Sequence, residues 1–275
     1  MEKKIADYIS RIEIESMWGR KHIVWDLRPD VNILSGVNGV GKSTIINSTI
    51  DKLDYMDGGE IGNHADLGVN FGFSPSDANC VRYDVIRSID RPLMRSNLLE
   101  KMSDKNVVSE LDWQLYRLQR RYLDYQVNIG NRTIELLSSD DEDKIKQAKN
   151  VSSPKIQFLD FVDEMFLCTR KRIVRNSNEI LFEQEGEVLL PYSLSSGEKQ
   201  MLVILLTTLV QDMQHCVLFM DEPEISLHIE WQQQLISRVR AMNPNVQIIL
   251  TTHSPAVVMD GWMDAVTEVD DITIK

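Results

Sequence analysis

The sequence predicts an α/β protein with a mixed, largely parallel sheet core, N-terminal antiparallel strands and a helical insertion. Three observations lead to this fold class. Short apolar runs at 31–34, 217–220 and 246–250 stop abruptly at polar or glycine residues, as expected of strands at the centre of a sheet. Apolar residues after these runs recur at helical spacing. At 9–16 and 22–27, apolar and polar residues alternate, which is typical of half-buried strands.

A chain of 275 residues, 43% of them hydrophobic, can bury a full core. We expect a single domain over 1–275, because no low-complexity linker divides the chain and one segment interrupts the two halves of the core. The N-terminal lobe is expected at 1–95, the helical insertion or arm at 96–170, and the C-terminal lobe at 171–275.

The N-terminal lobe is expected to begin with two strands joined by a turn at Gly19. The apolar strand 31–34 comes next, followed by a helix. The apolar residues on one face of that helix are Ile45, Ile46, Ile50 and Leu53. Glycines then crowd the stretch 58–72, which predicts a loop or an irregular edge, and residues 80–90 return to strand character.

The insertion is expected to be mainly helical. Ser109 and Asp112 have the spacing of a capping box. The helix that follows carries a heptad seam made by Leu111, Leu115, Leu118, Tyr122 and Tyr125. Because this seam is too short for a coiled coil, we expect an arm that folds on the domain or projects a little from it. A charged loop and short helix at 138–150 precede a helix opened by Ser153 and Pro154.

The C-terminal lobe alternates strands and helices. Short strands are expected between 170 and 192, and a strongly apolar helix at 201–210. The apolar run 217–220 is suited to a strand buried on both faces. A helix at 229–242 then leads to the strand that begins at 246.

A glycine-rich stretch, GVNGVGKST from Gly36 to Thr44, lies between the strand 31–34 and the first helix. It fits the pattern G-x-x-x-x-G-K-[ST], in which backbone N–H groups close on phosphates, a lysine reaches the outer phosphates and a hydroxyl ligates Mg²⁺. Strand, glycine loop and helix is the context that this motif requires. An ordinary glycine-rich turn is the alternative, and we expect a nucleotide cradle.

The segment LSSGEKQ, Leu194–Gln200, stands directly before the apolar helix. A capping box from Ser195 to Glu198 accounts for two of its residues. It does not account for Gly197, because glycine in a first helical turn costs about 1 kcal/mol relative to alanine unless a backbone approaches closely. Two hydroxyls and a glycine at a helix N-terminus indicate an anion site.

Two acids, Asp221 and Glu222, follow directly on the strand 217–220. Ligands of open α/β sheets lie at the carboxyl ends of the strands. We expect Asp221 to support Mg²⁺, directly or through water, and Glu222 to polarise an attacking water. A solvated acidic turn is the alternative. His253 lies just past the strand at 246–250, where it could meet a γ-phosphate, although a lone histidine is more often structural.

Taken in order, GVNGVGKST, LSSGEKQ, VLFMDEPE, SLH and TTHSP resemble the Walker A, signature, Walker B, D-loop and H-loop motifs of ABC-type ATPases. The set is most similar to the SMC, RecF and OLD-like AAA family ATPases, in which DEPE-x-x-LH and THSP are usual. The resemblance implies a P-loop NTPase fold of the ABC-ATPase type, with ATP and Mg²⁺ as ligands. It also implies a homodimer in which ATP is sandwiched between the Walker A of one copy and the signature of the other.

The resemblance assigns roles to individual residues. Lys42 holds the β- and γ-phosphates, and Ser43 ligates Mg²⁺ together with Asp221. Glu222 is the catalytic base and His253 senses the γ-phosphate. The rest of the cradle is formed by Gly36, Asn38, Gly39, Gly41 and Thr44. The signature that would act on the partner copy comprises Ser195, Ser196, Gly197 and Glu198, and of these Ser195 and Gly197 would contact the γ-phosphate.

Two positions depart from the transporter pattern. Ser196 stands where the signature of transporters has glycine, and His228 stands where their D-loop often has aspartate. The Q-loop glutamine stays unassigned, because the candidates all lie in expected helices. These candidates are Gln114, Gln119, Gln126 and Gln157.

The bulk composition favours a soluble cytoplasmic protein. The net charge of −12 argues against a grip on DNA by the whole surface, although arginines and lysines at 117–121 and 170–175 leave DNA possible. No export signal is visible, and the longest apolar run, 201–210, is about half of a membrane span. The cysteines Cys80, Cys168 and Cys216 have no metal-site spacing and are expected to be free thiols.

Three functions are compatible with the motifs. The first is an ATPase switch of SMC and RecF type that closes a homodimer on ATP and acts on DNA or on a partner effector, in DNA repair or anti-phage defence. The second is the ATP-hydrolysing subunit of a membrane transporter. The third is a slow-turnover ATP-sensing scaffold of a toxin or defence complex. The short stretch after the TTHSP motif makes a built-in nuclease unexpected, so an effector or nuclease encoded separately is the expected partner.

Overall fold

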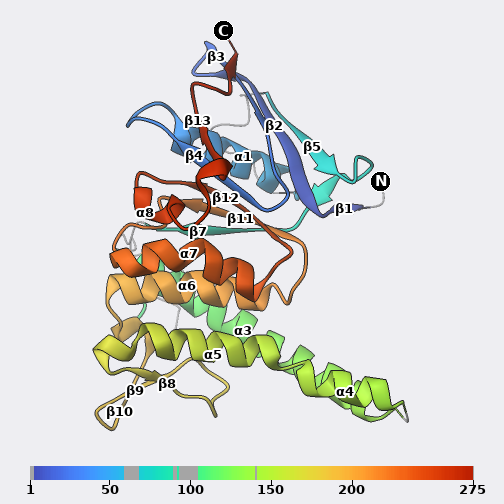
Figure 1. Cartoon of the computed structure of the whole chain (residues 1–275), viewed down its shortest axis with the longest axis vertical. Coiled ribbons are helices and arrows are strands. Elements are labelled where there is room, and N and C mark those ends of the chain that lie inside the picture. The colour runs from blue at the N-terminus through green and yellow to red at the C-terminus, as the bar shows by residue number, and fades with distance from the viewer. Residues whose placement is uncertain (1–2, 59–67, 89–91, 93–104, 140, 275) are drawn as a thin grey trace.

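The computed structural model of the chain describes residues 3–58, 68–88, 92, 105–139 and 141–274. Its centre is a five-stranded sheet in the order β13-β4-β12-β11-β7, in which every pair of neighbours is parallel (Figure 1). The strands are β4 (Val31–Ser35), β7 (Tyr83–Arg87), β11 (Cys216–Asp221), β12 (Val246–Thr251) and β13 (Val266–Glu268). The three predicted apolar runs are therefore its three inner strands.

A second sheet is antiparallel and comes mainly from the N-terminal segment. Its order is β14-β3-β2-β5. The strands are β2 (Tyr8–Met17), β3 (Lys21–Asp26), β5 (Val69–Ser74) and β14 (Thr273–Ile274). The predicted turn at Gly19 is confirmed, because Gly19 has a left-handed φ of 70° between β2 and β3. Two further short strands, β1 (Ile5–Ala6) and β6 (Cys80–Val81), pair with each other in parallel.

The C-terminal end of the predicted loop or irregular edge over 58–72 is the edge strand β5, which pairs along β2 with a shift of register between Ile9 and Arg11. Val69, Phe71 and Phe73 alternate with smaller or polar residues, and this period of two prevails over the glycines. Gly72 serves the strand pairing, because a Cβ atom there would lie 2.9 Å from Ser10 Oγ. The rest of that prediction, residues 59–67, lies outside the described residues.

Helices cover both faces of the parallel sheet. The helix α1 (Lys42–Met56) lies between the two sheets, and α6 (Ser196–Val210) and α7 (Ile229–Met242) lie on the opposite face of the parallel sheet (Figure 1). α6 is buried nearly all round, which explains why its apolar residues show no single stripe. The short helix α8 (Pro255–Val258) follows β12. Each of the two faces of the sheet has its own apolar cluster.

The helical insertion is confirmed, and its arm folds on the domain along the buried seam of α3 and projects beyond it (Figure 1). α3 (Glu110–Leu137) begins at the expected capping box of Ser109 and Asp112, and its buried seam continues past Tyr125 to Ile129. With α4 (Glu142–Asn150), the far half of α3 extends away from the sheets (Figure 1). α5 (Ser153–Met165) returns along α3, with Pro154 in its first turn. Residues 96–104 of the expected insertion lie outside the described residues.

A small antiparallel sheet, in the order β10-β9-β8, packs beyond α5 (Figure 1). Its strands are β8 (Arg172–Ile173), β9 (Phe182–Gln184) and β10 (Glu187–Leu189), which confirms short strands in this part of the chain. All three cysteines are free thiols, as expected. No helix among the described residues has both the length and the apolar character needed to cross a bilayer.

Candidate nucleotide-binding site

The loop from Gly36 to Gly41 connects β4 to α1 through left-handed backbone. Gly36, Gly39 and Gly41 have φ angles of 143°, 80° and 117°, which L side chains rarely adopt. A Cβ atom at Gly41 would also lie 2.9 Å from Met17 Cε. The glycines of the predicted cradle are therefore required by its shape.

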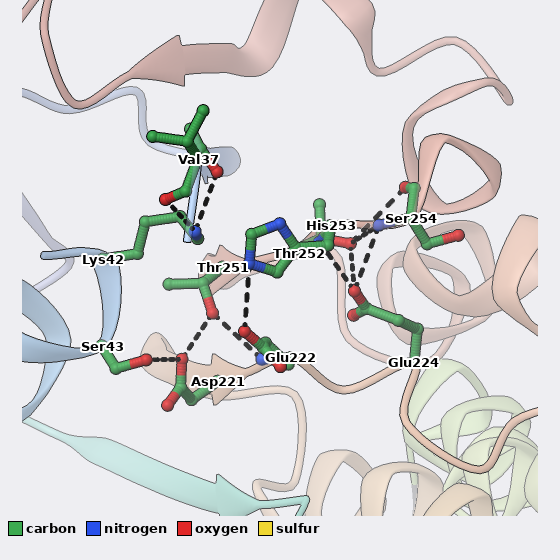
Figure 2. A network of polar contacts seen from close by, with 11 residues as sticks. Val37, Lys42, Ser43, Asp221, Glu222, Glu224, Thr251, Thr252, His253 and Ser254 are labelled. Carbon is green, nitrogen blue, oxygen red and sulfur yellow. Dashed lines mark hydrogen bonds and ion pairs between the residues drawn. The ribbon is translucent and has the colours of Figure 1, made fainter. Parts of the chain in front are cut away.

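The N-terminus of α1 offers its backbone N–H groups without a side-chain cap. Gly41 is the N-cap residue, no side chain bonds to the first turn, and that turn holds no acid. Such a terminus attracts phosphate through its free N–H groups and helix dipole. Lys42 is 5% exposed, and its Nζ donates to the carbonyl oxygens of Gly36 at 2.9 Å and Val37 at 3.3 Å (Figure 2). The ammonium group therefore lies inside the loop.

The end of β11 meets the start of α1 at Ser43. The hydroxyl of Ser43 donates to Asp221 Oδ1 at 3.0 Å (Figure 2). A hydroxyl and a carboxylate are oxygen donors of the kind that Mg²⁺ prefers, with phosphate and water oxygens completing the shell. In the described part of the chain, no group of three His, Cys, Asp or Glu side chains could hold a metal ion by itself. The donor set thus fits Mg²⁺ bound together with a phosphate.

Glu222 leaves the strand in a strained conformation. Its φ is 49°, which is uncommon for a residue with a side chain and is found most often at functional sites. Its N–H donates to the carbonyl oxygen of Thr251 at 3.2 Å and to its hydroxyl at 3.0 Å. The same hydroxyl donates to Asp221 Oδ1 at 2.5 Å. Thr251 therefore fixes both acids.

His253 lies against Glu222, with Nε2 3.3 Å from Glu222 Oε1 (Figure 2). Both side chains are partly exposed, at 37% and 32%. A carboxylate beside an imidazole can take a proton from water or hand one on. The structure thus brings Lys42, Ser43, Asp221, Glu222 and His253 to one edge of the sheet, at the carboxyl ends of β4, β11 and β12.

The segment 195–198 lies apart from this edge. It begins α6, on the face of the parallel sheet opposite α1 (Figure 1), and no hydrogen bond or ion pair among the described residues joins it to the Gly36–Thr44 loop. Ser195 and Glu198 form the expected capping box. Ser195 and Ser196 are exposed, and the Ser195 hydroxyl donates to Glu198 Oε2 at 2.9 Å within the capping box.

Gly197 is required by a contact within the chain. A Cβ atom at this position would lie 2.3 Å from the carbonyl oxygen of Ser226, far inside van der Waals distance. Ser226 itself has a left-handed φ of 71°. The close backbone approach that the glycine indicated is therefore made to the segment after β11.

Glu198 is buried and belongs to an ion pair. It is 2% exposed, and both of its oxygens lie 2.9 Å from Lys171 Nζ. Burial raises the pKa of Glu198, but hydrogen bonds from Lys171, Ser195 and Thr169 outweigh that effect and leave the pKa below its usual value. Glu198 thus holds the signature turn in place and does not point outward toward a ligand.

Removing the cation of this pair should destabilise the fold. We expect Lys171→Met to lose about 3–5 kcal/mol of unfolding free energy at neutral pH, because Glu198 would stay buried without its partner. Folding lowers the Glu198 pKa, so its stabilisation is present above the unfolded-state pKa and is lost as pH falls through the folded-state pKa. The difference between variant and wild type should therefore shrink in acid.

Urea denaturation at a series of pH values measures this difference. The matched control is Lys146→Met, whose ion pair with Asp143 is exposed at 70% and 82% and should change stability by less than about 1 kcal/mol. Equal losses for the two variants would contradict the role of Lys171.

Sequence reasoning missed two groups beside the cradle. Trp18 follows β2 with a φ of 55° and is 45% exposed. A Cβ atom at Gly41 would lie 3.0 Å from its ring, and Lys21 Nζ lies 5.5 Å from the ring centroid. An exposed tryptophan in a turn was the available signal. Thr251, which fixes both acids, gave no signal because a threonine at a strand end is ordinary.

A family model described as "AAA domain, putative AbiEii toxin, Type IV TA system" matches residues 81–260. The chain is 27% identical over 185 residues to the retron Vc95 probable ATPase of Vibrio cholerae serotype O1 biovar El Tor, covering 65% of this chain and 33% of that protein. It is 24% identical over 308 residues to the Septu protein PtuA of Bacillus thuringiensis, covering 91% of this chain and 72% of that protein.

The chain thus spans about a third of the length of the first of these relatives and about three quarters of the second. Among solved structures, it is similar to an SMC head bound to the C-winged helix domain of ScpA. The TM-score is 0.50 with 14% identity, covering 97% of this chain and 96% of that one. This likeness confirms the predicted fold class, a P-loop fold of the ABC and SMC-head type.

Proposed function

The chain belongs to the AAA domain family of putative AbiEii toxins of Type IV TA systems, and from that premise we propose that it is a Mg²⁺-dependent ATPase. The observation that carries the proposal is the joining of Ser43 to Asp221 and of Glu222 to His253 at the edge where α1 presents its N-terminus. A phosphate binder without hydrolysis needs no carboxylate and imidazole beside the cradle. The retron relative, which is named as a probable ATPase, supports the same function.

In this proposal each side chain has a defined task. Lys42 and the free N–H groups of α1 hold the phosphates, and Ser43 and Asp221 hold Mg²⁺, which supplies positive charge to the phosphate oxygens. Glu222 accepts a proton from the attacking water and His253 keeps the Glu222 carboxylate in place. Trp18 offers a ring face on which the base stacks.

We propose that the complete site needs a second copy of the chain. Ser195 and Ser196 are exposed at the start of α6, where they would lie against the γ-phosphate held by a partner copy. Large apolar side chains on the segments that leave the site are also exposed, as expected of a surface that another molecule covers. They are Val37 at 76%, Ile225 at 38%, Ile229 at 52%, Met259 at 67% and Met263 at 64%.

We propose that the ATP-bound dimer acts on a protein effector in anti-phage defence. The named relatives, a retron ATPase and a Septu protein, support defence over transport. DNA is less well supported, because the basic clusters are partly neutralised within the chain. Arg121 pairs with Asp84, and Arg175 pairs with two aspartates.

Nucleotide binding tests the cradle directly. We expect Lys42→Ala to weaken binding of both ATP and inorganic tripolyphosphate about 10- to 100-fold, because a charge-assisted contact to phosphate is lost. Trp18→Ala should weaken binding of ATP by about 5- to 100-fold through lost stacking and leave binding of tripolyphosphate unchanged. Isothermal titration calorimetry with both ligands separates the two effects.

Trp18→Phe is the matched control, since it keeps an aromatic face and should retain most of the affinity for ATP. Unchanged affinity of Lys42→Ala for both ligands would contradict the cradle. If Trp18→Ala lost equal affinity for ATP and for tripolyphosphate, the stacking role of Trp18 would be contradicted, but the cradle would not.

A further inference from the structure

Glu224, the last acid of the segment that follows β11, is buried with 8% of its surface exposed. No cationic side chain among the described residues pairs with it. Its Oε1 instead accepts three hydrogen bonds, from Thr252 Oγ1 at 2.6 Å, His253 N at 2.8 Å and Ser254 N at 3.2 Å (Figure 2). All three donors belong to the segment that carries His253.

Burying the Glu224 carboxylate costs free energy of folding. A buried carboxylate is tolerated when hydrogen bonds compensate for lost hydration, yet Oε2 of Glu224 is buried and has no hydrogen-bond partner in the described part of the chain. An apolar side chain would avoid that cost. What a glutamate provides at position 224, and an apolar residue would not, is therefore the set of hydrogen bonds accepted by Oε1.

The backbone held by Glu224 determines where the His253 ring lies. His253 is the second residue after β12, and the N–H groups of His253 and Ser254 both donate to Glu224 Oε1, with the Ser254 N–H shared with Thr252 Oγ1 at 3.0 Å. On the far side, Ser254 Oγ donates to Gln232 Oε1 at 2.6 Å. The main chain around His253 is thus fixed from two directions, while its ring is free to meet Glu222 at 3.3 Å.

The two strand ends hold each other in a reciprocal manner. Thr251, at the end of β12, fixes Asp221 at the end of β11 and Glu222 directly after it. Glu224, three residues past the end of β11, fixes Thr252 and His253 after β12. Each segment supplies one reactive side chain and one side chain that orients the other segment.

We propose that Glu224 is a positioning residue, which holds the His253 imidazole against Glu222 through the backbone of residues 252–254. This inference rests on the proposed ATP hydrolysis, in which the Glu222 and His253 pair handles the attacking water. Misplacing a reacting group by about 1 Å can cost about 100-fold in rate. The role needs hydrogen-bond acceptance by Oε1 and does not need the negative charge.

The test compares Glu224→Met, which fills similar space without a carboxylate acceptor, with Glu224→Gln, which retains an acceptor oxygen. We expect Glu224→Met to lower kcat for ATP about 10- to 100-fold with KM changed less than about threefold, since the nucleotide cradle is untouched. Glu224→Gln should stay within about threefold of wild type. The exposed Glu187→Ala, on β10, is the control and should leave kcat unchanged.

A double-mutant cycle separates positioning from general structural damage. If Glu224 acts through His253, Glu224→Met should cost less than about twofold in a His253→Ala background. A full additional loss in that background, or a Met variant as active as wild type, would overturn the inference. Should Glu224→Met fail to fold, Thr252→Val removes one of the three donors and is expected to lower kcat about threefold, again only when His253 is present.

Hydrogen exchange of the amides of His253 and Ser254 gives a readout that does not depend on hydrolysis. We expect these amides to exchange at least about tenfold faster in Glu224→Met and at the wild-type rate in Glu224→Gln. If the wild-type chain fails to hydrolyse ATP, the proposed function fails, and unchanged exchange in Glu224→Met would separately overturn the positioning role.

Discussion

Glu222→Gln is expected to bind ATP with Mg²⁺ as wild type does and to hydrolyse it about 10²- to 10⁴-fold more slowly. The amide has the shape of the carboxylate but cannot take a proton from water. Its backbone stays fixed by the N–H bonds to Thr251, so the geometry should be preserved. Single-turnover hydrolysis of radiolabelled ATP measures the rate without the influence of product release.

Glu230→Gln is the matched control, because Glu230 is exposed in the first turn of α7, near the same segment. It should hydrolyse ATP at the wild-type rate. Hydrolysis by Glu222→Gln within tenfold of wild type would exclude Glu222 as the general base and would direct attention to His253.

Gly197→Ala is expected to lose hydrolysis and about 1–3 kcal/mol of unfolding free energy. The added methyl carbon would lie 2.3 Å from the Ser226 carbonyl oxygen. The contact can be relieved only by moving backbone, because the carbonyl oxygen belongs to the main chain and the methyl carbon is fixed to it. Either the first turn of α6 or the segment after β11 must therefore shift, with the strain of an overpacked contact. Chemical denaturation and the ATPase rate of the same preparation give the two quantities.

Gly130→Ala provides the matched control for a glycine in a helix. Gly130 lies inside α3, and a Cβ atom there meets nothing within 4 Å. This substitution should stabilise the chain by about 0.5–1 kcal/mol, because alanine is the better helix former. If Gly197→Ala were as stable and active as Gly130→Ala, the close contact with Ser226 would not constrain the turn.

The order of strands and helices was predictable because most elements carry an uninterrupted pattern. The inner strands β4, β11 and β12 are short apolar runs, and α3 is indicated by a capping box and an apolar heptad seam. β5 was predicted only as part of a loop or an irregular edge, since its glycines weaken the strand signal while its pairing with β2 comes from distant residues. The packing of α6 on the far face of the sheet likewise depends on contacts that no local pattern encodes.

The candidate site was predictable where a local motif carries the chemistry, as at Gly36–Thr44 and at Asp221 and Glu222. The side chains that orient those groups were not. Thr251 and Glu224 act across two strand ends, and their partners are about 30 residues away in sequence. Trp18 reaches the cradle only because β2 passes beside α1. Such roles arise from contacts between segments that are distant in sequence, so no local sequence pattern predicts them.

We propose that ATP closes two copies of this chain around shared sites. The mass of Glu222→Gln in solution, measured by light scattering after size-exclusion chromatography at micromolar concentration, tests it most directly. We expect the mass of one chain without nucleotide and of two chains with MgATP, and the mass of one chain under both conditions when Lys42→Ala is added. A Glu222→Gln protein that binds MgATP and keeps the mass of a single chain would contradict the claim.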